Sequence, residues 1–260
     1  MKIVVCIKQV PDTNEVKLDP VTGTLIRDGV PSIINPDDKA GLEAALALKD
    51  AYGAEVSVVS MGPPQADAVL REAMAMGADN AYLITDRAFG GADTLATSTT
   101  IAAAIKKMEY DLIITGRQAI DGDTAQVGPQ IAEHLNIPNV SYAEAIKVDG
   151  NTVTIKRQYE DRYHTVKVQM PCLITALGEM NKPRYMTPGG IFDAYRTKQV
   201  NIVTRADLDV ADAEIGLKGS PTKVAASWPK SVKAAGTKVV LDPQESADYI
   251  VEKLKEKFVF

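Results

Sequence analysis

The feature that most constrains the fold is the alternation of short apolar runs with helical segments through the first half of the chain. Four runs have the length and the continuous apolar character of strands that are buried on both faces. They lie at residues 2–8, 55–61, 81–85 and 112–115. Strands and helices that alternate in this way predict an α/β fold with a doubly wound, mostly parallel sheet and right-handed crossovers.

The predicted helices have recognisable start and stop signals. Asn35 followed by Pro36 and two aspartates is typical of a helix start, and Gly53 is expected to end that helix. Asp93 is predicted to cap a helix that runs to residue 107. Asp123 begins a pattern that resembles a capping box, which predicts a helix from there to residue 135.

The second half follows another pattern. Apolar and polar residues alternate at 145–148, 152–158 and 165–169, with Asp149-Gly150 as a turn, which predicts added antiparallel strands. A further buried strand is predicted at 172–176, and an early hairpin at 17–28 with Thr22-Gly23 as its turn.

Beyond residue 190 the chain is polar and irregular until a terminal helix that Asp242 is expected to cap. We therefore predict a nucleotide-binding α/β domain at 1–190 and a C-terminal extension, or arm, at 191–260. One face of the terminal helix is apolar, with Ala247, Ile250, Val251, Leu254 and Phe258. Such a face can pack on its own domain or dock on another protein, and the pattern leaves both alternatives open.

Composition excludes several functional classes. The 260 residues carry a net charge of −5, which disfavours broad binding to nucleic acids or anionic membranes. No apolar run approaches the roughly 20 residues of a membrane-spanning helix, and no signal peptide is recognisable. The two cysteines and two histidines are too few and too dispersed to predict a metal site. We expect a protein of the cytoplasm.

Ligands of open α/β sheets bind at the carboxyl ends of strands, where the strand order reverses. The loop that follows the fourth predicted strand, 116–129, supplies glycines, amide donors at a helix start and Arg117 as a counter-charge. Asp121 and Asp123 disfavour a terminal phosphate lying directly on the loop, but they suit ribose hydroxyls or backbone amides. The alternative is that Asp123 only caps the helix and the glycines only form turns.

The sequence contains neither a GxGxxG nor a GxxxxGK[ST] motif, and no nucleophile has a base close to it in the sequence. Cys6 lies inside a buried strand, where an inert thiol is expected. We therefore predict no catalytic side chain on this chain. That absence points to redox or binding work, in which a cofactor carries the chemistry.

The chain resembles the beta subunit of electron-transfer flavoproteins along essentially its whole length. The matching motifs are KQVPD at 8–12, NPDD at 35–38, AMAMGAD at 73–79, the 116–129 loop and NKPRY at 181–185. The resemblance implies an adenine-nucleotide-hydrolase-like fold that works beside an alpha subunit. Simple members hold AMP in this domain, and electron-bifurcating members hold a second FAD.

Carried over position by position, the resemblance implies a set of cofactor contacts, of which that of Cys6 is made through its backbone. They are Cys6, Asn35, Asp38, Met61, Gly62, Asp93, Thr94, Asp121, Gly122, Asp123, Thr124, Gln126 and Val127.

The sequence also departs from the simple carriers. They place a leucine anchor after the Arg-Tyr pair for docking acyl-CoA dehydrogenases, whereas here Met186 follows Arg184 and Tyr185. Arg162 and His164 also stand where the family has other residues, which puts the chemistry of the local hairpin in doubt. The early segment at 21–27 is similar to that of the bifurcating members from anaerobes.

The bifurcating type implies NADH as electron donor. It also implies ferredoxin or flavodoxin as one acceptor and, through the FAD of the partner subunit, an acyl-CoA dehydrogenase as the other. Arg184, Tyr185 and Met186 would then form the docking site. Two alternatives stay open, namely a non-bifurcating carrier with structural AMP and a nucleotide-sensing module of the universal-stress type.

Overall fold

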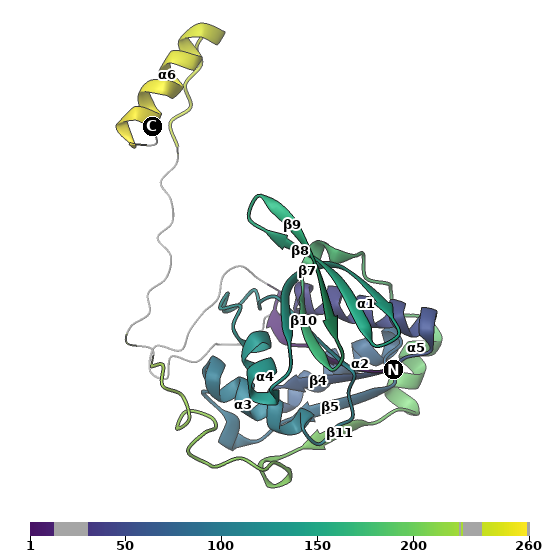
Figure 1. Cartoon of the computed structure of the whole chain (residues 1–260). Helices are drawn as coiled ribbons and strands as arrows, with labels where there is room; N and C mark the ends of the chain where they lie inside the picture. The colour runs from purple at the N-terminus through teal and green to yellow at the C-terminus, as the bar shows by residue number, and fades with distance from the viewer. Residues whose placement is uncertain (13–30, 224, 226–235, 259–260) are drawn as a thin grey trace. The chain divides into compact units, whose positions relative to one another are not determined.

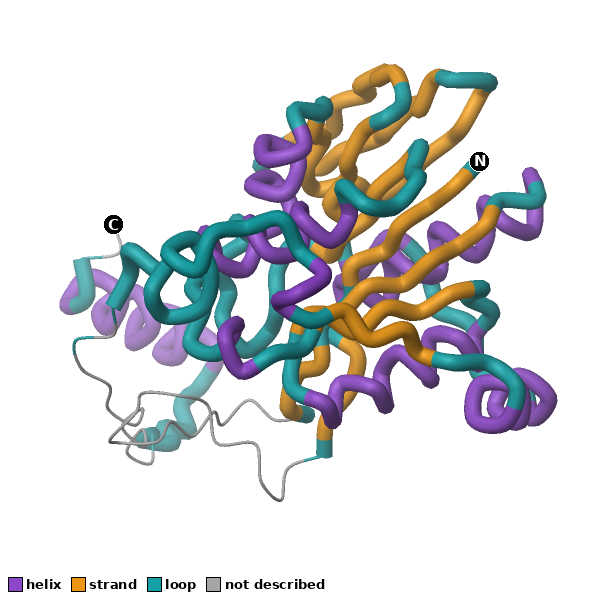
Figure 2. Tube along the Cα trace, turned by 90° about the horizontal axis from the view of Figure 1, so that it is seen from below, coloured by secondary structure: helices purple, strands orange, loops and turns teal. Residues whose placement is uncertain are grey.

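A computed structural model describes residues 1–12, 31–223, 225 and 236–258. The chain divides into two compact units, Met1–Ser227 and Trp228–Phe260. The first unit holds a sheet of nine strands in the order β11-β5-β4-β1-β6-β10-β7-β8-β9, with helices on both of its sides (Figures 1 and 2). The hairpin predicted at 17–28 lies outside the described residues.

The strands pair in two modes. From β11 to β7 neighbouring strands are parallel, and β7, β8 and β9 are antiparallel. The sheet strands are β1 Lys2–Cys6, β4 Glu55–Met61, β5 Asn80–Ile84, β6 Leu112–Gly116, β7 Asn139–Asp149, β8 Thr152–Tyr159, β9 Arg162–Gln169, β10 Cys172–Ala176 and β11 Val200–Val203. A small antiparallel pair joins β2, Gln9–Pro11, to β3, Ser32–Ile34. The doubly wound α/β fold and the added antiparallel strands are confirmed.

The helices divide between two cores, one on each face of the sheet. Val5 and Val58 belong to the core shared with α1 and α2, whereas their neighbours Val4 and Val59 belong to the core shared with α3 and α4. Successive strand residues point to opposite faces, so a continuous apolar run is what this arrangement requires. The helices of the first unit are α1 Pro36–Tyr52, α2 Asp67–Met76, α3 Thr94–Ile105, α4 Val127–Leu135 and α5 Pro188–Arg196.

Helix boundaries follow the sequence signals in part. Gly53 ends α1 in the left-handed region with φ 65°, and the Asp93 side chain caps α3, both as predicted. Asn35 precedes α1 but makes no capping hydrogen bond with its side chain. The helix predicted from Asp123 begins four residues later, at Val127, because Asp123 and Ala125 have φ of 50° and 53°. A right-handed helix cannot include that conformation.

Two elements beyond residue 187 were not predicted. Helix α5 packs on α2, and β11 pairs in parallel with β5. The helix begins Pro188-Gly189-Gly190, and its glycines are poor helix formers. At Gly190 a glycine is needed, since an added Cβ would lie 2.3 Å from the carbonyl oxygen of Ala75. The division between the units therefore lies after Ser227 and does not coincide with the boundary expected at residue 190.

The second unit contains helix α6, Pro243–Glu256. The Asp242 carboxylate accepts a hydrogen bond of 2.9 Å from the Glu245 amide, so the predicted cap is confirmed. On the expected apolar face, Ile250 and Val251 are exposed. None of the described helices combines the length and the apolar character that crossing a bilayer requires.

Candidate functional site

The candidate site lies where the strand order reverses. From β1 the chain proceeds to β4 and β5 on one side, and it later returns to place β6, β10 and β7 on the other. Strand β1 pairs in parallel with both β4 and β6, so their carboxyl ends meet at one edge. The crevice outside β1 and β6 is therefore the position at which such a sheet binds ligands.

Asp38 joins the ends of these two strands. Its Oδ2 accepts a hydrogen bond of 2.8 Å from the Lys8 amide, and its Oδ1 accepts one of 2.9 Å from the Gly116 amide. Burial raises the pKa of Asp38 to about 7, although hydrogen bonds from Lys8, Asn35 and Gly116 oppose the rise. Only glycine fits at position 116, because an added Cβ would lie 2.2 Å from Oδ1 of Asp38.

Asn35 holds the loop that follows β6. This side chain is fully buried, its Nδ2 donates to the Gln118 carbonyl at 2.8 Å, and its Oδ1 accepts from the Ile120 amide at 3.0 Å. Both ends of the amide are thus committed to the protein. Asn35 serves as a structural support of the loop.

The loop itself is constrained at several points. Lys8 forms an ion pair of 2.6 Å with Asp121, whose side chain is only 5% exposed. Nε2 of the Gln118 side chain donates to Oδ1 of Asp123 at 2.9 Å. The positive φ angles of Asp123 and Ala125 cost free energy in non-glycine residues, and such conformations gather at functional sites. Gly122 and Thr124 are exposed beside them.

The start of α4 has the properties of an anion site. Its first residue, Val127, follows Gln126, whose side chain does not cap the helix but accepts a hydrogen bond of 2.8 Å from the Thr94 hydroxyl. The first amides of α4 therefore have no capping side chain. An added Cβ on Gly128 would lie 2.5 Å from Oγ1 of Thr115, so the helix start packs directly against the end of β6. The first amides of a helix bind phosphate groups well.

Asp93, by contrast, is fully engaged by the protein. Its Oδ1 accepts from the Ala96 amide and its Oδ2 from the Thr222 amide, each at 3.1 Å. Burial works to raise the pKa of Asp93, but these hydrogen bonds outweigh it and the pKa is lowered. Neither Ser220, which bonds the Asp93 amide, nor Thr222 was expected at the site. Since they lie more than 120 positions from Asp93, no local sequence signal could have found them.

Cys6 and the end of β4 complete this edge. Burial raises the pKa of the Cys6 thiol to about 12, so the thiol stays neutral and is a poor nucleophile. Met61 ends β4, and the Gly62 amide donates to the Ile84 carbonyl. The structure therefore brings the expected cofactor residues to the carboxyl edge of neighbouring parallel strands. Lys8 and Gly116, which were not among the expected residues, lie at the same edge, where their amides donate to Asp38.

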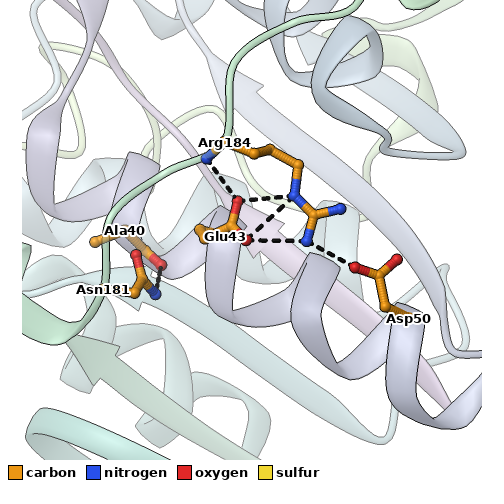
Figure 3. Close-up of polar contacts among 5 residues, drawn as sticks. All are labelled: Ala40, Glu43, Asp50, Asn181 and Arg184. Carbon is orange, nitrogen blue, oxygen red and sulfur yellow. Dashed lines mark hydrogen bonds and ion pairs between the residues drawn. The ribbon is translucent and has the colours of Figure 1, made fainter.

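The expected docking residues lie elsewhere and differ from one another. Arg184 is held on α1 (Figure 3), where its Nη2 lies 2.9 Å from Oε1 of Glu43 and 2.8 Å from Oδ2 of Asp50. Hydrogen bonds to the Glu43 and then the Asp50 side chain raise the pKa of Arg184. Tyr185 and Met186 are 87% and 43% exposed. Arg184 thus attaches this stretch of chain to α1, while the next two residues, Tyr185 and Met186, are exposed.

Comparison with known proteins gives consistent matches. Residues 22–208 match the family described as the electron transfer flavoprotein domain. An electron transfer flavoprotein subunit beta of Clostridium acetobutylicum is 62% identical over 257 residues, 99% of each chain. The caffeyl-CoA reductase-Etf complex subunit CarD of Acetobacterium woodii is 55% identical, and the acryloyl-CoA reductase electron transfer subunit gamma of Anaerotignum propionicum is 48% identical. Each of these two alignments covers both chains completely.

Proposed function

Because this chain belongs to the electron transfer flavoprotein family, as a beta subunit, we propose that it binds FAD in the crevice outside β1 and β6. The proposed complex takes electrons from NADH. It passes them to ferredoxin or flavodoxin and, through the FAD of the alpha subunit, to an acyl-CoA dehydrogenase. The process is flavin-based electron bifurcation.

The observation that carries this proposal is the uncapped start of α4 beside a strained loop at the switch point of the sheet. A diphosphate can accept hydrogen bonds from the first amides of α4, and the Thr124 hydroxyl is exposed beside these amides. In this proposal Asp123 and Gly122 contact a ribose. Cys6, through its backbone, and the end of β4 contact the adenine.

When bound, FAD supplies the capacity to accept electrons in pairs and release them singly. The residues of the chain bind and orient the cofactor. Asp121 is neutralised by Lys8, so the loop does not present that charge to a diphosphate. The Cys6 thiol stays protonated and the Asp38 carboxyl is buried, so these side chains supply no nucleophile to the crevice.

The names of two relatives support the proposed dehydrogenase partner. One is named as a subunit of a caffeyl-CoA reductase-Etf complex and the other as an electron transfer subunit of acryloyl-CoA reductase. Both names join electron transfer to a reductase of a CoA ester, which supports an acyl-CoA dehydrogenase as the partner proposed here. Tyr185 and Met186 are exposed for that docking, with Arg184 as their support.

The main alternative is a non-bifurcating carrier in which structural AMP occupies the same crevice. The family membership favours electron transfer over the nucleotide-sensing alternative. We further propose that the C-terminal extension docks on the alpha subunit through the exposed apolar face of α6. A cytoplasmic location agrees with the free thiols of Cys6 and Cys172.

Substitution in the strained loop tests the site. Thr124→Ala should weaken the binding of one FAD by about one to two decades, the usual effect of losing a hydrogen bond to a charged group. Asp123→Asn removes the charge but keeps a residue that tolerates the left-handed conformation, so it should also weaken one FAD. The measurement is the FAD content and affinity of the purified heterodimer.

Thr165→Ala is a matched control, because it removes an exposed hydroxyl on β9, outside the loops of this site. It should leave both flavins bound. Unchanged affinity for both flavins in Thr124→Ala and Asp123→Asn would show that the crevice is not the flavin site.

A further inference from the structure

The segment that follows β11 is attached to the loop between β5 and α3 by two aspartates that use the same arrangement. Asp86 accepts from the Ala88 amide with Oδ1 at 2.9 Å and from the Arg205 amide with Oδ2 at 3.1 Å. Asp93 caps α3 with one oxygen and accepts from the Thr222 amide with the other. Each carboxylate therefore holds its own loop and a distant stretch of chain together.

The attachment near Asp93 has further contacts. The buried Ser220 hydroxyl accepts from the Asp93 amide at 2.8 Å and lies 2.7 Å from the Gly216 carbonyl, to which it donates. The Leu217 amide donates to the Gly90 carbonyl at 3.0 Å. We call residues 216–222, which make these contacts, the anchor segment. It belongs to the first unit and precedes the second in the sequence.

The anchor segment is connected to the nucleotide site through one short path. Thr94, the first residue of α3, donates from its hydroxyl to Gln126 at 2.8 Å, and Gln126 immediately precedes the uncapped start of α4. Asp93 precedes Thr94 and is bonded to Thr222. Three residues, Asp93, Thr94 and Gln126, thus link the anchor segment to the amides proposed to donate to the diphosphate.

We propose that Asp93 is a positioning residue that couples nucleotide binding at α4 to the attachment of the anchor segment. Both of its carboxylate oxygens are taken by protein amides, so it acts through Thr94 and Gln126. A bound nucleotide fixes the starts of α3 and α4 and thereby holds the anchor segment more firmly. By linkage, the attached segment raises the affinity for the nucleotide to the same extent. The loading of the crevice is in this way communicated to the segment that precedes the second unit in the sequence. This coupling rests on the proposed function for the identity of the nucleotide.

Two variants break the attachment. Ser220 is not among the expected cofactor contacts whereas Asp93 is, so Ser220→Ala is the decisive variant. Ser220→Ala removes the hydroxyl that accepts from the Asp93 amide. Asp93→Asn keeps an oxygen for the Ala96 amide but turns an NH2 group toward the Thr222 amide, where two donors oppose each other. Thr100→Val is the matched control, since it removes a buried hydroxyl that bonds only within α3.

The experiment uses the heterodimer, stripped of the FAD of this chain and then titrated with FAD. Hydrogen exchange of the Leu217 and Thr222 amides is measured with and without FAD, together with the FAD dissociation constant and the visible circular dichroism of the bound flavin. In the wild type, FAD should slow exchange at these amides. Ser220→Ala and Asp93→Asn should weaken FAD binding roughly fivefold or more and remove its effect on exchange. The control should behave as the wild type.

The coupling is wrong if FAD binds Ser220→Ala with wild-type affinity, or if FAD leaves exchange at Thr222 unchanged in the wild type. A wild-type heterodimer that holds FAD only on the alpha subunit would instead overturn the proposed function. In that case the titration is repeated with AMP. Slower exchange at the Thr222 amide and weaker AMP binding in Ser220→Ala would support the coupling, and no change in either would contradict it.

Discussion

Gly116→Ala tests the join between β1 and β6 on which the site is built. The added Cβ would lie 2.2 Å from Oδ1 of Asp38, 2.7 Å from the Asp38 backbone nitrogen and 2.8 Å from Cβ of Asp37. The first of these atoms can move only if the carboxylate rotates. The other two belong to the first turn of α1, so relieving them requires the helix start to shift.

The cost follows from these contacts. Overpacking a closely packed site costs about 1–3 kcal/mol. Rotation of the Asp38 carboxylate also weakens its hydrogen bonds from the Lys8 and Gly116 amides, and a bond to a charged group contributes about 1.5–3 kcal/mol. The lower ends of these two ranges add to about 2.5 kcal/mol, so we expect the free energy of unfolding to fall by at least that amount. Since each kcal/mol lowers the midpoint by about 2–4 °C at this size, Tm should drop by about 5 °C or more.

The assay is thermal unfolding of the heterodimer, followed by circular dichroism. Gly189→Ala is the matched control, because an added Cβ there meets nothing within 4 Å and alanine favours the helix in which it lies. The control should melt at the wild-type temperature or slightly above it. If Gly116→Ala melts within about 1 °C of the wild type, the close contact between β6 and Asp38 is not present in solution.

Three further predictions address pH, the Arg184 contact and assembly. Because burial raises the pKa of Asp38 to about 7, its contribution to stability is full below the unfolded pKa of about 3.9 and is lost as the pH rises through 7. Acidification from about pH 8 to about pH 6 should therefore raise Tm more in the wild type than in Asp38→Asn, and equal shifts would contradict the assignment. Arg184→Ala should lower the free energy of unfolding by about 1–2 kcal/mol, because it leaves Glu43 without its partner, whereas Tyr185→Ala should change it by less than about 0.5 kcal/mol. Equal losses in denaturant titrations would show that the ion pair does not stabilise the chain. Truncation after Asp242 should weaken heterodimer formation in sedimentation experiments while the first unit stays folded, and normal pairing would refute docking through α6.

The sequence predicts the parallel core because strands that are buried on both faces have continuous apolar runs. Val4 and Val5 point into different cores, yet both must be apolar, so the run through β1 is continuous. The edge strand β11 does not require a continuous apolar run, since two of its four residues are exposed. Its place beside β5 is decided by long-range pairing, which periodicity cannot show.

The sequence predicts where the candidate residues gather but not how they contact one another. Strand ends and glycines indicate the edge of the sheet at which the structure brings these residues together, and the resemblance supplies the residues. The positive φ at Asp123 and Ala125 was not foreseeable, because the same residues also fit a capping box. The engagement of Asp93 by Thr222 was hidden for another reason, namely that it depends on how a distant segment returns to the loop.

The central claim is that this chain holds a flavin of its own. The most direct test is to purify the heterodimer, release its nucleotides by denaturation, and quantify FAD and AMP by chromatography against protein concentration. We predict two FAD per heterodimer and no AMP. One FAD accompanied by one AMP would contradict the claim and identify the chain as the subunit of a non-bifurcating carrier.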